Sequence, residues 1–255
     1  MTDFKYRSYQ DSDIEIISSC RTSDDEHMMV AHRFLQKLIK EFARLSMLCY
    51  LPRYDSYVMP FGYSERQLDS VVLPALSNIC KGCVLAELPV MRKERRTGKL
   101  IGSGNGRTDY WCIYEGYSIF IEMKGARIST RNKLSETTTI ATPWKEMIKQ
   151  LDEEDAECRA SEERTKGCIR IGLYFIALTD SRDRDISKDK FKDKMDEVSN
   201  TLCNKKESSK EIPSYAATWI LPENLARTEM LDGRFYKGVI LISKIFKTIK
   251  HKNHV

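Results

Sequence analysis

The sequence GRTDYWCIYEGYSIFIEMKGA, residues 106–126, decides the fold, because it reads as two β-strands joined by a tight turn. Glu115 and Gly116 are suited to the turn, and the flanking residues are mostly aromatic, β-branched or otherwise apolar, as in a buried sheet. Three charged residues, Asp109, Glu122 and Lys124, interrupt this apolar pattern. A buried sheet that carries two carboxylates and an amine needs a physical explanation.

A two-residue turn determines which residues of the two strands face each other. With Glu115 and Gly116 as the turn, paired positions sum to 231, so Asp109 is predicted to lie opposite Glu122. Side chains alternate along a strand, so Lys124 belongs to the same face as Glu122. We therefore expect the three side chains to lie within about 5–8 Å of one another at their Cβ atoms.

Two carboxylates that face each other repel, unless a cation neutralises them. A divalent cation does this, and two carboxylate ligands completed by water suit Mg²⁺ or Mn²⁺. The alternative interpretation is an ordinary ion pair between Glu122 and Lys124 on a solvent-facing strand. A slip of one residue in the turn would also separate Asp109 from Glu122.

The rest of the chain alternates helical and strand-like segments. Apolar residues spaced by three and four positions predict helices over 25–50, 64–79, from 142 to about 151 and near 187–203. Apolar and β-branched runs predict strands over 84–91, 108–114, 117–124, 168–178, 215–221 and 236–243. Residues 1 to about 24 have no clear period and are expected to form a loose arm. This order predicts an α/β fold with a mixed central sheet flanked by helices.

Composition limits the class of protein. The 255 residues are 41% hydrophobic and 31% charged, and 42 basic against 37 acidic residues leave a net charge of +5, which is compatible with a polyanionic partner. No secretory leader or membrane span is predicted, so we expect a cytoplasmic protein with no membrane partner and with reduced cysteines. Cys80-x-x-Cys83 lacks the second pair that a structural zinc site needs.

Asp109, followed on the next strand by Glu122-Met123-Lys124, resembles the motif of the PD-(D/E)xK nuclease superfamily. The resemblance covers about residues 64–178, where the predicted order of helix, three strands, helix and strand matches the core of that family. Two positions depart from the family pattern. Thr108 replaces the motif's Pro, and the Gln-x-x-x-Tyr helix motif of one branch is absent.

The resemblance implies a domain organisation and a restriction-endonuclease-like core. Residues 64–255 are expected to form the nuclease-like domain. Residues 1–63 are expected to form an N-terminal helical extension, an arm and an amphipathic helix packed on the core. The N-terminal helix also offers a surface for a homodimer, as an alternative to packing within the chain.

The resemblance also implies the role of each motif residue. Asp109 and Glu122 are expected to hold Mg²⁺ or Mn²⁺, and Lys124 to position the attacking water and stabilise charge. The family often adds an acid from the first helix or strand, for which Glu65 and Glu87 are candidates. The alternatives are a first-turn acid favoured by the helix dipole for Glu65, and a strand-edge charge for Glu87.

We therefore predict a Mg²⁺-dependent phosphodiesterase, an endonuclease that hydrolyses DNA or, less favoured, RNA, in a defence, mobile-element or repair context. The connection between two predicted strands carries one acid and six cations: Arg92, Lys93, Arg95, Arg96, Lys99 and Arg107. We expect these cations to contact the phosphate backbone. Two alternatives remain open: a catalytically inactive module that binds nucleic acid or protein, and a phosphodiesterase that acts on a small nucleotide.

Overall fold

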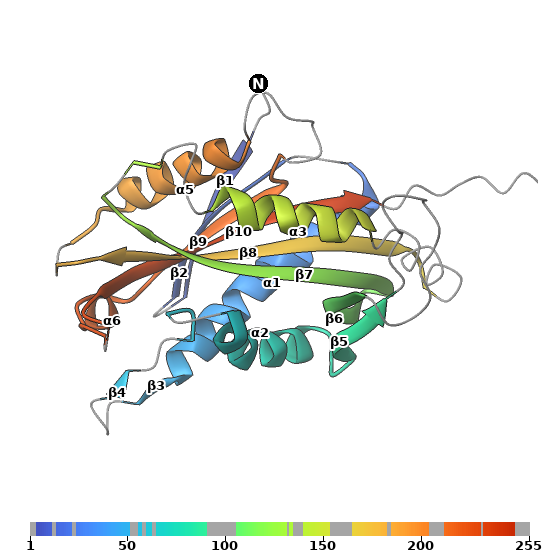
Figure 1. Cartoon of the computed structure of the whole chain (residues 1–255), viewed down its shortest axis with the longest axis horizontal. Coiled ribbons are helices and arrows are strands. Elements are labelled where there is room, and N and C mark those ends of the chain that lie inside the picture. Colours follow the sequence, from blue (N-terminus) through green and yellow to red (C-terminus); the bar gives the residue numbers. More distant parts are fainter. Residues whose placement is uncertain are drawn as a thin grey trace, which may run out of the picture.

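The computed structural model of the chain is built around one large sheet with helices on both faces (Figure 1). It describes residues 4–11, 14–21, 24–51, 56–57, 60–62, 65–90, 106–131, 133–134, 140–153, 165–182, 185–203, 212–230 and 232–247.

The sheet has eight strands in the order β1-β2-β9-β10-β8-β7-β6-β5. Strands β7 and β8 are parallel, and the other neighbouring pairs are antiparallel, so the sheet is mixed. The strands are β1 (Phe4–Asp11), β2 (Ile14–Arg21), β5 (Val84–Val90), β6 (Gly106–Tyr114), β7 (Tyr117–Ser129), β8 (Cys168–Asp180), β9 (Tyr215–Ile220) and β10 (Phe235–Lys247). Strands β3 (Tyr50–Leu51) and β4 (Ser56–Tyr57) form a separate two-stranded sheet.

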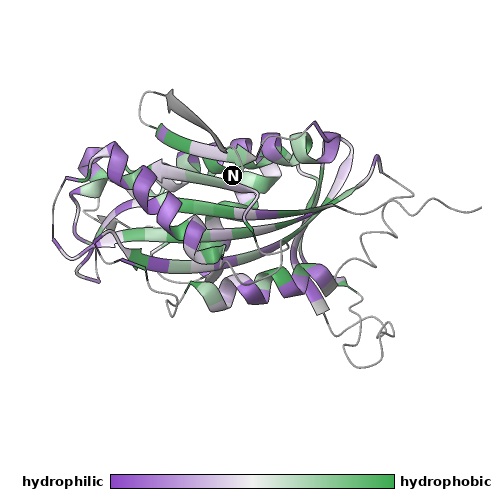
Figure 2. Cartoon of the chain, turned by 90° about the horizontal axis from the view of Figure 1, so that it is seen from above, coloured by the Kyte–Doolittle hydropathy of each residue, from purple (hydrophilic) through white to green (hydrophobic). Residues whose placement is uncertain are grey.

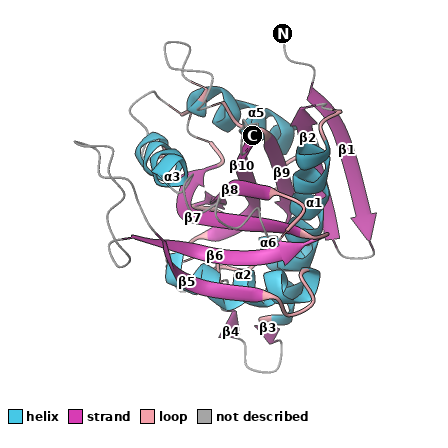
Figure 3. Cartoon of the chain, turned by 90° about the vertical axis from the view of Figure 1, so that its right-hand side faces the viewer, coloured by secondary structure: helices cyan, strands magenta, loops and turns pink. Residues whose placement is uncertain are grey.

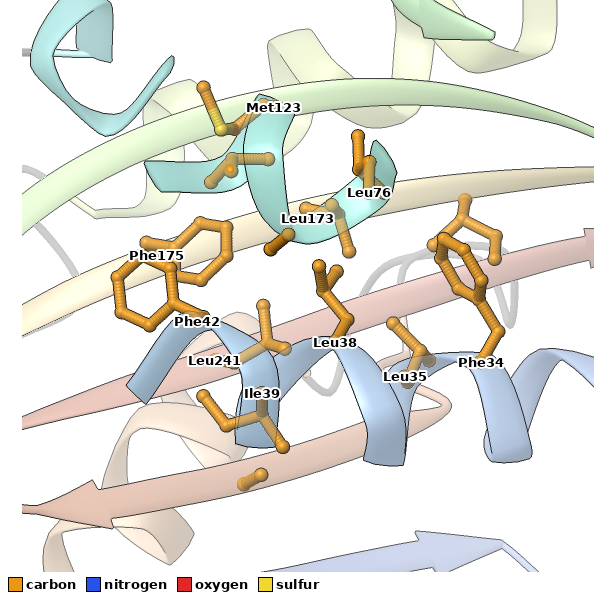
Figure 4. Close-up of a cluster of buried hydrophobic side chains, with 14 of the residues drawn as sticks. Phe34, Leu35, Leu38, Ile39, Phe42, Leu76, Met123, Leu173, Phe175 and Leu241 are labelled. Atoms are coloured by element: carbon orange, nitrogen blue, oxygen red, sulfur yellow. The ribbon is translucent and has the colours of Figure 1, made fainter. Parts of the chain in front are cut away.

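Two long helices cover each face of the large sheet. On one face, α1 (Glu26–Leu48) and α2 (Glu65–Ile79) share a hydrophobic core with one side of the strands (Figure 4). On the other face, α3 (Ala141–Glu153) and α5 (Lys188–Leu202) bury a second cluster. The short helix α6 (Glu223–Ala226) precedes β10. The prediction of an α/β fold with a mixed sheet flanked by helices is confirmed.

Helix α1 illustrates how the sequence determines its local structure. The side chain of Asp25 accepts a hydrogen bond from the backbone N–H of Met28 at 3.2 Å, which caps the first turn. Leu38 and Phe42, one turn apart, are fully buried, and the Phe42 ring stacks on Phe175 with centroids 4.7 Å apart. Figure 2 shows hydrophobic residues concentrated in the strands, while the helices carry both hydrophilic and hydrophobic residues. Burial of each such side chain contributes about 1.5–3 kcal/mol.

The expectation of a loose N-terminal arm is wrong. Strands β1 and β2 form an antiparallel hairpin, and β2 extends the sheet by pairing with β9, with Ile17 opposite Thr218. This pairing joins residues about two hundred positions apart, so no local pattern reveals it. Helices α1 and α2, which lie on either side of the expected boundary at residue 63, share one core.

Several strands extend further than their apolar runs predict. Strand β7 continues past Lys124 to Ser129 because it pairs with β8 along its whole length, with Ser129 opposite Thr179.

Cys168 is disulfide-bonded, so the expectation of reduced cysteines is wrong at this residue. Among the residues that the structure describes, no helix is both long enough and apolar enough to cross a membrane.

Candidate active site

The hairpin that joins β6 and β7 has the predicted turn and register. Glu115 and Gly116 have φ angles of 51° and 86°, as in a two-residue turn that requires two positive φ values. The ladder then pairs Tyr114 with Tyr117, and continues to Tyr110 opposite Ile121. The predicted sum of paired positions is therefore confirmed over the whole ladder.

The backbone ladder ends one position before Asp109 and Glu122. Beyond the pair of Tyr110 and Ile121, the backbone of β7 forms hydrogen bonds with side chains of β6 instead of with the backbone of β6. The Asp109 Oδ2 atom accepts the backbone N–H of Met123 at 2.6 Å, and the Thr108 hydroxyl donates to the carbonyl of Ile121 at 3.1 Å. The Asp109 carboxylate is thus held against the backbone of β7 at Met123, the residue that follows Glu122. We call this divergence of β6 from β7 the fork.

The motif residues of β7 lie on the face of the sheet that α3 covers. Ile121 and Met123 are buried in the opposite core, under α1 and α2, so Glu122 and Lys124 project to the α3 side. Glu122 is only 1% exposed, whereas Asp109 and Lys124 are half-buried. A carboxylate as buried as Glu122 requires a compensating charge or hydrogen bonds if it is to remain ionised.

The neighbouring strand β8 shapes the environment of Glu122. Glu122 lies opposite Gly172, where an added Cβ atom would stand 2.6 Å from Met147 of α3. Arg170 lies two positions earlier on the same side of β8, is 4% exposed and donates from Nη1 to the carbonyl of Leu151 at 2.6 Å. The sequence offered a signal for Arg170, since it interrupts an otherwise apolar strand.

Glu87 lies on β5 opposite Asp109, between the pairs of Ala86 with Tyr110 and Leu88 with Thr108. Its backbone has φ 55°, which non-glycine residues seldom adopt. Its Oε2 atom lies 3.0 Å from Nη1 of Arg107, and both side chains are about two-thirds exposed. Glu87 is therefore close to the fork in register but engaged with a cation at the surface.

The remaining predicted acid, Glu65, is the first residue of α2, and its side chain lies outside the described residues. One turn later on α2, Asp69 accepts a hydrogen bond from the hydroxyl of Tyr110. Burial raises the pKa of Tyr110, and Asp69, Asp109 and Glu87 raise it further by their negative charge. Asp69 was not predicted, because nothing in the local sequence distinguishes it from other surface acids of a helix.

The two carboxylates that the sequence predicts as metal ligands, Asp109 and Glu122, lie on neighbouring strands just beyond the end of the ladder. Across the described part of the chain, no group of three or more His, Cys, Asp or Glu side chains is arranged to hold a metal ion. Two carboxylates match the requirement of Mg²⁺, which usually keeps several waters and takes one or two protein carboxylates.

Of the six predicted substrate-binding cations, Arg107 is at the surface of β6, two residues before Asp109. The other five, Arg92, Lys93, Arg95, Arg96 and Lys99, lie outside the described residues. No family model, curated protein or solved structure matches the chain. The fork and the charged residues around it are therefore the features of the chain that indicate a function.

Proposed function

We propose that the chain is a metal-dependent nuclease that hydrolyses phosphodiester bonds. The observation that carries this proposal is the fork, where the carboxylate of Asp109 is fixed beside Glu122 and Lys124 follows on the same face. Two carboxylates and an amine in a largely apolar sheet carry a desolvation cost that apolar residues at the same positions would avoid.

The arrangement of elements around the fork supports the proposal. The elements follow one another along the chain in the order α2, β5, β6, β7, α3 and β8. Strands β5, β6 and β7 are successive antiparallel neighbours, and β8 joins β7 in parallel. This order of elements agrees with the core that the resemblance to the PD-(D/E)xK superfamily implies. We therefore include a restriction-endonuclease-like core in the proposal.

Asp109 and Glu122 would hold the Mg²⁺ or Mn²⁺ ion. When bound, such an ion lowers the pKa of a coordinated water and neutralises charge on the scissile phosphate. Asp109 is suited to this role because Met123 orients its carboxylate through a charge-assisted hydrogen bond of 2.6 Å. Glu122 is suited because burial strengthens its interaction with any cation that reaches it.

Lys124 supplies the remaining chemistry from the chain. It follows Glu122 by two residues on the same face, about 7 Å along the strand. Its ammonium group would stabilise the negative charge that develops on the phosphate and hold the attacking water near it. Arg107 and the five cations of the preceding connection would bind neighbouring phosphates.

Cleavage of defined nucleic acids tests the proposal. Wild type is incubated with plasmid, linear and single-stranded DNA and with RNA, in chelator, Mg²⁺ or Mn²⁺, beside Asp109→Asn. A matched control is Asp193→Asn, an exposed aspartate on α5. We expect metal-dependent cleavage by wild type and by the control, and loss of at least about 100-fold in Asp109→Asn, because the variant replaces a proposed metal ligand with a neutral side chain. Equal cleavage by all three proteins would reject the assignment.

A second candidate is a non-catalytic nucleic-acid-binding or protein-interaction module with the same sheet. The observation that favours it is the small donor set: Glu87 is engaged with Arg107, and the described residues contain no group of three or more His, Cys, Asp or Glu side chains arranged to hold a metal ion. This candidate predicts binding of nucleic acid with a steep salt dependence and no cleavage with either metal.

A further inference from the structure

An apolar row crosses three strands next to the fork. Leu85 of β5 pairs with Trp111 of β6, and Trp111 pairs with Phe120 of β7. Trp111 and Phe120 lie on the same face as Asp109 and Glu122, each two residues nearer the Glu115-Gly116 turn than the carboxylate of its strand. The row therefore runs parallel to the carboxylates at a distance of about 7 Å.

The row is accessible at its β5–β6 end. Phe120 is 2% exposed, Trp111 is partly exposed, and Leu85 is 50% exposed. The described helices of this face, α3 and α5, pack on β7, β8 and β9, and Figure 3 shows α3 beside β7 and β8 rather than over β5. A single exposed leucine needs no explanation, but a leucine paired with an accessible tryptophan beside a charged site has the composition of a binding surface.

Trp111 is held in place by its one polar group. The indole N–H donates to the hydroxyl of Ser118 at 2.6 Å, a diagonal neighbour on β7. Because this bond satisfies the only donor of the side chain, the accessible part of Trp111 is aromatic carbon. A fixed aromatic surface of this kind suits contact with another planar, weakly polar group.

A cation lies on the other side of the carboxylates. Arg107 precedes Asp109 by two residues, and its side chain is 68% exposed in an ion pair with the equally exposed Glu87. Exposed pairs contribute little to stability, so a phosphate can compete for the guanidinium. Along β6, positions 107, 109 and 111 thus present a cation, a carboxylate and an aromatic ring at intervals of about 7 Å.

We propose that Leu85 and Trp111 form a stacking platform for an unpaired base, and that the substrate is single-stranded nucleic acid, or a single-stranded region of it. This inference rests on the proposed function, since it places the base beside the phosphate that the fork would bind. Bases in a duplex are stacked within the helix and cannot reach a flat protein surface, whereas unpaired bases stack on aromatic side chains with little regard to sequence.

Intrinsic fluorescence tests the platform without a label. The chain has three tryptophans, of which Trp144 is 1% exposed and Trp219 is fully buried, so Trp111 is the one that a ligand can contact. A poly-dT oligonucleotide and a duplex of the same length are titrated in chelator, where metal-dependent cleavage does not occur. We expect the single strand to quench the emission and to bind more tightly than the duplex.

Three variants locate the effect. Trp111→Leu should weaken single-strand binding by about 5- to 100-fold and abolish the quenching, as expected for the loss of one stacked base. Trp111→Phe should retain most of the affinity, because it keeps an aromatic face. Leu85→Ser changes an exposed side chain, so the fold should survive while single-strand affinity falls.

The outcomes separate the platform from the proposed nuclease. Two results would overturn the platform even if the chain cleaves DNA. The first is unchanged tryptophan emission together with equal affinity for duplex and single strand, and the second is wild-type single-strand affinity in Trp111→Leu. Single-strand binding that quenches Trp111 without cleavage in any metal would support the platform and reject the nuclease.

Discussion

Neutralising Glu122 should stabilise the metal-free protein, although most substitutions of a buried residue destabilise. Glu122 is 1% exposed, and Asp109 is fixed beside it by the bond to Met123. If both are ionised without metal, they repel each other. Glu122→Gln keeps the shape of the side chain and removes this repulsion.

The expected gain follows from the spacing of the strands. Two unit charges about 5.5 Å apart repel by roughly 1–3 kcal/mol for effective dielectric constants between about 80 and 20. Weaker hydrogen bonds of the neutral amide offset part of this, by about 0.5–1 kcal/mol. We therefore expect Glu122→Gln to raise the free energy of unfolding by about 0.5–2 kcal/mol in chelator. Asp109→Asn should gain less, because it also weakens the bond to Met123.

Urea unfolding and thermal melting in chelator and in millimolar Mg²⁺ or Mn²⁺ measure both effects. At a metal concentration ten times the dissociation constant, wild type should gain about 1.4 kcal/mol through linkage. That gain corresponds to a rise in Tm of about 3–5 °C for a domain of this size. Glu122→Gln should gain little from metal. Glu146→Gln, an exposed glutamate of α3, is the matched control and should behave as wild type.

The interpretation of Glu122 and Lys124 as a structural ion pair makes the opposite prediction. In that case Glu122→Gln leaves Lys124 without its partner, lowers stability in chelator, and metal changes the Tm of neither protein. That combination of results would refute the reasoning from carboxylate repulsion.

Three further predictions concern other parts of the molecule. Burial lowers the pKa of His32 below its usual value, although a backbone hydrogen bond with Ser214 opposes this shift. The unfolded chain therefore binds more protons than the folded chain below about pH 6.5, and the stability of the fold should decrease there. Urea midpoints measured over a pH series test this, and a His32→Gln variant as pH-dependent as wild type would contradict it. Gly172→Ala should lower the free energy of unfolding by about 1–3 kcal/mol, because the new Cβ atom would stand 2.6 Å from the end of the Met147 side chain. Adding Met147→Ala to this variant should recover part of the loss in urea unfolding. The double substitution of residues 95 and 96 to Glu should weaken DNA and RNA binding similarly across sequences and flatten its salt dependence, and unchanged affinity at low salt would show that the connection makes no phosphate contact.

Local rules predicted the part of the site that depends on one hairpin. The turn at Glu115-Gly116 and the alternation of side chains were sufficient to predict the register from Tyr114 opposite Tyr117 to Tyr110 opposite Ile121, which stops one position before Asp109 and Glu122. The fork itself was not predictable, because the turn fixes which positions pair but not where the pairing ends. In the structure the pairing ends where the Asp109 side chain bonds to the backbone of Met123.

Features that depend on distant pairing or on unusual backbone geometry were missed. The pairing of β2 with β9 brings the N-terminal residues into the sheet, and their polar sequence carries no strand signal strong enough to reveal it. Glu87 was expected as a possible ligand, but its positive φ and its ion pair with Arg107 depend on the three-dimensional course of β5 and β6.

The most direct test of the central claim compares cleavage and metal binding in Lys124→Ala. Lys124 is not among the expected metal ligands, so the variant should bind Mn²⁺ in calorimetry about as tightly as wild type. Its cleavage of single-stranded and duplex DNA at saturating metal should nevertheless fall by about 100-fold or more, as expected for the loss of a group that stabilises transition-state charge. Lys190→Ala, an exposed lysine of α5, should retain full activity. Cleavage by Lys124→Ala at the wild-type rate would contradict the account.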